Sequence, residues 1–160
     1  MENDVYQKLT RKVGIEQSKY VPEIWKILCS PEEAALLNAL PATAQDLAEC
    51  FGKTTDDIER MTRLLFRKGV LYEGSKGYHM SRNIVQFHDS TTLWPEAPQE
   101  LIKTWRLYIE EEYPDFHAFR VSSNRPPIFR VVPINEKIET KSRVLAYEDA
   151  VSILEKASNL

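Results

Sequence analysis

Helix start and stop signals follow one another at short intervals between residues 30 and 82, and they constrain the fold more than any other feature of the sequence. The segment SPEE at 30–33 is a strong helix start. Its serine can accept a backbone N–H, its proline suits the first turn, and its glutamates suit the positive end of the helix dipole. Because proline cannot continue a helix, this helix is expected to end at Pro41.

Two more helices follow with equally short connections. Thr43 is expected to cap a short helix over 44–51, which the next glycine closes. Thr54 or Thr55 caps a longer helix over 56–68. The apolar spacing of the longer helix predicts four inward residues: Ile58, Met61, Leu64 and Leu65.

β-type residues come next, with a strand over 70–72, the turn segment GSKG at 74–77 and a return strand over 78–80. The order helix, short helix, longer helix, hairpin predicts a mainly α fold with a small β hairpin (α+β). This order is that of a winged helix-turn-helix over 30–82 followed by a helical C-terminal extension. The third helix of that arrangement is expected to lie on the surface.

Three domains are therefore expected: an N-terminal helical lead over 1–29, the winged helix-turn-helix over 30–82, and a helical extension and connector over 83–160. In the lead, helices are predicted over 3–14 and from Pro22 to about Cys29. In the extension, elements are predicted as follows: a helix over 99–112 with Leu101, Ile102, Trp105, Tyr108 and Ile109 on one side, a strand over 128–132, and a helix over 147–158.

The charge balance argues against the usual ligand of such a fold. The net charge of −3 excludes a strongly basic nucleic-acid binder, although it allows a local basic patch. Residues 1–82 contain 12 basic and 12 acidic side chains, and the third helix begins with Asp56, Asp57 and Glu59. These acids would repel phosphate, or would pair with the arginines that follow at helical spacing. The candidate nucleic-acid-binding residues are Arg60, Arg63, Arg67, Lys68, Lys76 and Arg82.

A group of aromatic residues lies beyond the predicted hairpin: Trp94, Trp105, Tyr108, Tyr113, Phe116 and Phe119. One interpretation is a second small core that packs the long helix on the first domain. The other is a partner or homodimer surface, because aromatic side chains are enriched at interfaces. The sequence leaves both interpretations open.

Neither catalysis nor metal binding is indicated. Cys29 and Cys50 are the only cysteines, they are not in a C-x-x-C motif, and no two histidines stand at i, i+4. The sequence also lacks a glycine-rich phosphate loop and a G-x-S-x-G motif. With no run of eighteen apolar residues and no apolar leader, we expect a cytoplasmic, non-membrane protein with two reduced, buried thiols.

Two stretches carry a resemblance to known proteins. The stretch SPEEAALLNALPATAQDLAECFGKTTDDIERMTRLLFRKGVLYEG resembles winged-helix modules of the broad MarR/ArsR-like type. The stretch FRVVPINEKIETKSRVLAYEDAVSILEKA resembles the connector of iron–sulfur proteins of anaerobes, in which such a module precedes a ferredoxin-type 4Fe–4S domain. Together the match covers about residues 30–160.

The resemblance implies a cluster domain that two cysteines cannot build, because a cluster needs four thiolates. The chain ends at Leu160, where the cluster cysteines of the resembled proteins would begin. We therefore expect either the N-terminal part of a longer redox protein or a version without the cluster domain, and Met1 favours a true start. No cofactor is expected in this chain, and 4Fe–4S clusters are expected only in the missing domain.

The sequence thus leads to two functional hypotheses. The first is a non-catalytic winged-helix module that docks on or regulates an iron–sulfur redox protein, its partner being that protein or the missing cluster domain. The second is a DNA-binding transcriptional regulator of MarR/ArsR-like type, with duplex DNA as its partner. An enzyme is not expected.

Overall fold

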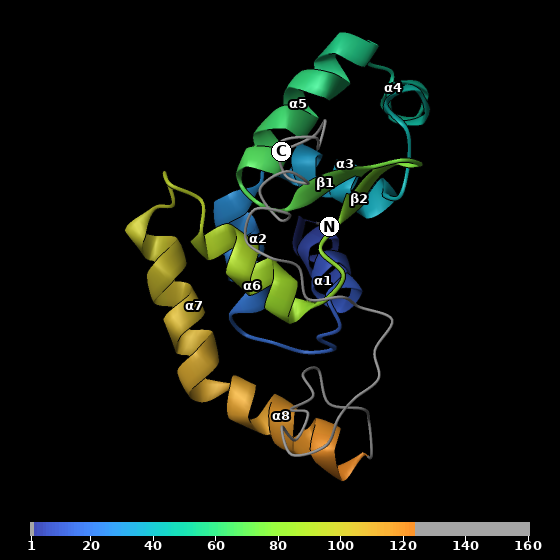
Figure 1. Ribbon diagram of the computed structural model, residues 1–160. Helices are drawn as coiled ribbons and strands as arrows, with labels where there is room; N and C mark the ends of the chain where they lie inside the picture. The colour runs from blue at the N-terminus through green and yellow to red at the C-terminus, as the bar shows by residue number, and fades with distance from the viewer. Residues whose placement is uncertain (1, 124–160) are drawn as a thin grey trace, which may run out of the picture. The chain divides into compact units, whose positions relative to one another are not determined.

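The computed structural model describes residues 2–123, in which helices dominate and a single two-stranded antiparallel hairpin is present (Figure 1). The prediction of a mainly α fold with a small β hairpin is confirmed. The elements are α1 (Glu2–Lys12), α2 (Val21–Leu28), α3 (Pro31–Ala39), α4 (Ala44–Phe51), α5 (Thr55–Arg67), β1 (Leu71–Gly74), β2 (Gly77–Met80), α6 (Ile84–Thr92), α7 (Gln99–Glu111) and α8 (Tyr113–Ser122).

The helix starts form as the sequence predicts. Ser30, Thr43 and Thr54 each cap a helix through a capping box, in which the cap side chain and the N3 side chain satisfy each other's backbone N–H. Thr54, and not Thr55, is the cap of α5. Each box holds together four neighbouring residues, which explains why the sequence alone could locate it.

The hairpin is fixed by a close approach of backbone to backbone. Leu71 pairs with Met80 and Gly74 with Gly77, which leaves a two-residue turn. Gly77 adopts φ +104°, and a Cβ there would lie 2.6 Å from the carbonyl oxygen of Ala42. Only glycine fits such a position. The hairpin is thereby tied to the segment that precedes α4.

The core is shared by segments that the sequence assigned to different domains. Trp25 of α2 stacks on Phe87 of α6, with ring centroids 4.0 Å apart. Phe87 in turn meets the edge of Trp105 of α7 at 5.1 Å. The indole N–H of Trp105 donates a 3.0 Å hydrogen bond to Thr91 Oγ1, which is also buried. Buried residues from 1–29, 30–82 and 83–123 thus belong to one core, which crosses the boundaries expected at 29/30 and 82/83.

Two predicted inner faces need correction. On α5 the buried residues are Ile58, Thr62 and Leu65, whereas Leu64 is 47% exposed. Thr62 can be buried because its hydroxyl donates to the carbonyl oxygen of Glu59. The inward row therefore follows the spacing i, i+4, i+7, and Leu64 falls outside it.

On α7 the inward row is Leu101, Trp105 and Tyr108, which repeats the same spacing. Ile102 and Ile109 are 45% and 43% exposed, so their predicted place on that side is wrong. Pro114 lies at the junction of α7 and α8, and α8 begins directly at Tyr113. The strand predicted over 128–132 and the helix predicted over 147–158 lie outside the described residues.

None of the helices within residues 2–123 combines the length and the apolar character that a membrane span requires.

The shared core leads to a stability prediction. Phe87→Ala should lower the free energy of unfolding by roughly 3–5 kcal/mol, because the side chain is fully buried between two indole rings. Urea unfolding followed by circular dichroism measures the change. Leu93→Ala, at a residue 79% exposed, is the matched control and should stay within about 0.5 kcal/mol of wild type. Equal stability of the two variants would contradict the shared core.

Candidate functional site

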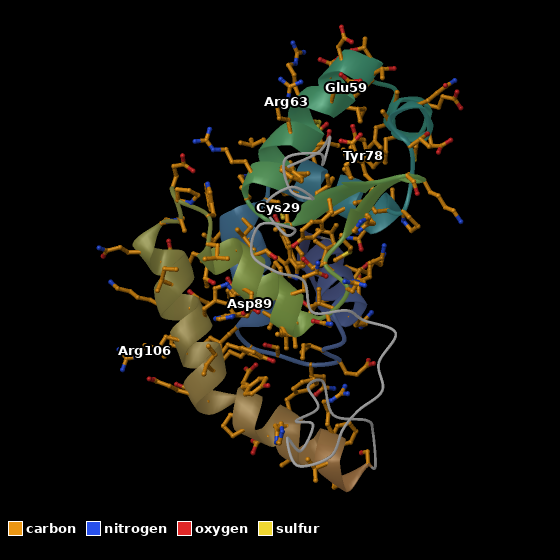
Figure 2. All side chains as sticks on the ribbon, viewed as in Figure 1. Cys29, Glu59, Arg63, Tyr78, Asp89 and Arg106 are labelled. Carbon is orange, nitrogen blue, oxygen red and sulfur yellow. The ribbon has the colours of Figure 1, made fainter. Side chains whose placement is uncertain are left out.

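The surface formed by α5 and the hairpin is the candidate functional site. α5 presents one side to solvent because Ile58, Thr62 and Leu65 anchor the opposite side in the core. Figure 2 labels Glu59 and Arg63 on α5 and Tyr78 on the hairpin, so both sides of this surface can be followed there.

A groove of about 360 Å³ runs between α5 and the hairpin. Its lining residues are Glu59, Thr62, Arg63, Phe66, Leu71, Glu73 and Tyr78. Two carboxylates and one guanidinium therefore face this groove, which gives it a negative balance. A phosphate backbone placed here would meet more repulsion than attraction.

Three of the six candidate nucleic-acid-binding residues are engaged with other parts of the chain. Arg60 forms an ion pair with Asp57, and Arg67 forms one with Glu96. Lys68 is only 14% exposed, and its ammonium donates a 2.6 Å hydrogen bond to the carbonyl oxygen of Leu28. The sequence anticipated the first pair from helical spacing, but Glu96 lies 29 residues from Arg67 and gave no such signal.

The partner carboxylates are held in the charged form. Hydrogen bonds from Thr54 and then from Arg60 lower the pKa of Asp57. A hydrogen bond from Arg67 likewise lowers the pKa of Glu96. Both pairs are solvent-exposed, and such pairs contribute little to stability. Their consequence here is electrostatic: a phosphate that displaced either carboxylate from its arginine would still lie beside a negative charge.

The other three candidates remain available. Arg63, Lys76 and Arg82 are exposed, and within residues 2–123 no carboxylate lies within ion-pair distance of them. They come from α5, the hairpin turn and the segment that follows β2. Three separated cations are a sparse set for phosphate, given the negative charges between them.

Apolar side chains on α5 are the feature that sequence reasoning missed. Phe66 is 57% exposed and Leu64 is 47% exposed. The period of the helix is a signal for Leu64, which points away from the inward row once Thr62 is accepted as buried. Phe66 stands four residues after Thr62, so its exposure could not be predicted from the period. We call Arg60, Arg63, Leu64, Phe66 and Arg67 the α5 surface. Exposed aromatic and arginine side chains together are typical of protein interfaces.

The aromatic group beyond the hairpin divides between core and surface. Trp105 and Tyr108 are 1% and 2% exposed, so their predicted place on a partner or dimer surface is wrong. Their rings continue the stack begun by Trp25, which is the second core considered from the sequence. Trp94, Tyr113 and Phe116 are half-buried against that core, and Phe119 is exposed.

The two thiols lie in different environments. Cys29 is buried, its Sγ donates to the carbonyl oxygen of Trp25, and burial raises its pKa to about 12. Cys50 is exposed, so the prediction of two buried thiols is wrong for it. Within the described residues no three His, Cys, Asp or Glu side chains are grouped so that they could hold a metal ion.

Comparison with known proteins adds no relative to this picture. No protein-family model, no curated protein and no solved structure matches the chain.

The thiol environments predict a selective reaction. A chromogenic aromatic disulfide at about pH 8 should label one thiol of the folded protein within minutes, since the Cys29 thiol is both buried and un-ionised. Cys50→Ser should abolish the fast reaction and Cys29→Ser should leave it unchanged. Absorbance of the released thiolate measures it, with the guanidinium-unfolded chain as the two-thiol reference. Fast labelling of Cys50→Ser would contradict the assignment.

Proposed function

We propose that the chain is a non-catalytic winged-helix module that docks on or regulates a ferredoxin-type iron–sulfur redox protein. The observation that carries this proposal is the α5 surface, where Leu64 and Phe66 are exposed beside arginines. Arg60, Arg63 and Arg67 stand at i, i+3 and i+7 and form one row along the helix, and Leu64 and Phe66 are exposed on either side of that row. Exposed apolar side chains beside arginines suit a protein partner better than a nucleic acid.

The winged-helix assignment rests on the element order. Helices α3, α4 and α5 are joined by short connections and are followed at once by β1 and β2. In winged helices the third helix and the hairpin form the recognition surface, and here these elements line one groove. Whether that surface binds a protein or a nucleic acid then depends on its charged and apolar side chains.

The identity of the partner rests on the resemblance of residues 129–157 to the connector of iron–sulfur proteins. The cluster itself would belong to the partner. A 4Fe–4S cluster needs four thiolates, whereas this chain has two cysteines, one of which is buried with a raised pKa. Free thiols also suit the cytoplasm, where we place the protein.

The second candidate function is a DNA-binding regulator. It is favoured by the same element order and by the three available cations, Arg63, Lys76 and Arg82. It is the weaker candidate because Glu59 and Glu73 share the groove with Arg63. A regulator would need these carboxylates to lie beside phosphates.

The double variant Leu64→Ser/Phe66→Ser tests the docking surface. Its affinity for the ferredoxin-type 4Fe–4S protein or domain encoded with this chain should fall at least about tenfold, because exposed apolar anchors supply much of the energy of an interface. Biolayer interferometry measures the affinity. Leu93→Ser removes a more exposed leucine, 79% exposed, that is not part of α5, and this variant should bind like wild type.

Both substituted side chains are exposed, so the melting temperature of the double variant should match that of wild type. Unchanged affinity in the double variant would overturn the assignment of the α5 surface. A genome in which no cysteine-rich cluster segment accompanies this reading frame would overturn the assignment of the partner.

A further inference from the structure

A second concave site lies away from the α5 surface, where the loop between α1 and α2 faces α7 and α8. Its volume is about 650 Å³, which is within the range of small-molecule pockets. The loop contributes residues 14–19, and the helices contribute Tyr108, Glu112, Asp115, Phe116 and Phe119. The loop, α7 and α8 all belong to the same unit of the chain.

This pocket has a built frame. The carboxylate of Glu112 accepts hydrogen bonds from the Ser18 hydroxyl and, at 2.8 Å, from the backbone N–H of Lys19. Tyr20 donates from its hydroxyl to the neighbouring Glu111. Hydrogen bonds to two consecutive glutamates thus attach the loop to the end of α7.

One residue that lines the pocket carries a buried polar atom without a partner. Tyr108 is 2% exposed, and its hydroxyl makes no hydrogen bond within the described residues. Burial raises its pKa, and the nearby charge of Glu112 raises it further, so the hydroxyl stays protonated. A buried hydroxyl without a partner costs free energy, and a ligand that supplied the missing hydrogen bond would recover it.

The charges around the pocket are unequal. Glu16, Glu112 and Asp115 carry three carboxylates, whereas Lys19 carries the one ammonium. That ammonium donates to the Tyr20 hydroxyl at 2.9 Å and lies over the Tyr20 ring. The Arg120 guanidinium also lies near the lining ring of Phe116, so three carboxylates face two cations, and the remaining negative balance would attract a cation.

Aromatic rings complete the arrangement. Tyr108 and Phe116 line the pocket, and the face of an aromatic ring attracts a cation through the ring quadrupole. Phe116 already has the Arg120 guanidinium 5.8 Å from its ring centroid, so this ring is in a position to contact positive charge. Ile15 and Phe119 add apolar surface for a hydrocarbon group.

We propose that this pocket binds a small organic amine with an aromatic or alkyl body. The ammonium would lie between the Tyr108 hydroxyl and the Glu112 and Asp115 carboxylates, and the body would lie against Ile15, Phe116 and Phe119. The site is independent of the α5 surface, so its test is separate from that of the proposed docking function.

Two ligands of the same ring and opposite charge test the proposal. Phenethylamine should bind the full chain with a dissociation constant of roughly 1 mM, as expected for so small a ligand, and phenylacetate should bind at least about tenfold more weakly. Titrations followed by two-dimensional ¹H–¹⁵N NMR measure both affinities and locate the shifts, which should centre on Tyr108 and Asp115.

Single-atom changes then separate the contributions. Tyr108→Phe removes only the hydroxyl and should weaken phenethylamine binding about tenfold. The same change should leave the melting temperature equal to or above that of wild type, because no protein hydrogen bond is lost. Asp115→Asn should weaken binding by a factor of about three. Tyr113→Phe, next to Tyr108 but outside the pocket lining, is the matched control and should bind normally.

The outcomes are decisive in either direction. The proposal is supported if the chain binds phenethylamine more tightly than phenylacetate and if Tyr108→Phe and Asp115→Asn each weaken phenethylamine binding. Equal binding of the two ligands overturns it, as does an amine affinity that neither substitution changes. Absence of any phenethylamine shift at about 20 mM also overturns it.

Discussion

The stack of Trp25, Phe87 and Trp105 is the interaction on which the rest of the structure depends. These three rings come from α2, α6 and α7, which are far apart in the sequence, and each is buried. The Trp105 N–H donates to Thr91, whereas the buried N–H of Trp25 has no hydrogen-bond partner within the described residues. The stack joins the lead to the extension, and Ile58 and Leu65 anchor α5 in the same core.

This support determines what α5 is free to do. Its inner row, Ile58, Thr62 and Leu65, is buried in the core. The end of the helix is held by two contacts: Lys68 donates to the carbonyl oxygen of Leu28, and Arg67 pairs with Glu96. The remaining exposed surface combines apolar side chains with arginines that have carboxylates close by. Such a helix offers few unpaired cations to phosphate. Its exposed apolar side chains beside arginines are typical of a protein interface.

Local features of the fold could be predicted from the sequence. Residues only a few positions apart form the hairpin turn and the capping boxes at Ser30, Thr43 and Thr54. These features can therefore be predicted from the sequence. Which residues of a helix are buried in the core could not be predicted from the sequence alone. Burial of Thr62 in place of Leu64 depends on a hydroxyl that bonds within its own helix, and a polar residue gives no apolar signal.

The candidate site shows the same division. The pairing of Arg60 with Asp57 follows from helical spacing, whereas Arg67 with Glu96 and the loop's attachment to Glu112 join residues that only folding brings together. Which aromatic residues beyond the hairpin are buried and which are exposed could not be predicted from composition either. Trp105 is in the core, where its ring meets Phe87, and Phe119 is at the surface, and the sequence does not specify this difference.

The central claim is that the surface of α5 and the hairpin is made for a protein and not for phosphate. The most direct test is a ¹H–¹⁵N NMR titration of the folded wild-type chain with a duplex of about 20 base pairs at roughly 50 mM salt, where phosphate contacts are strongest. The account predicts that the amide resonances of α5 and the hairpin stay in place up to equimolar DNA. Progressive shifts at Arg63, Lys76 and Arg82 that higher salt reverses would contradict it.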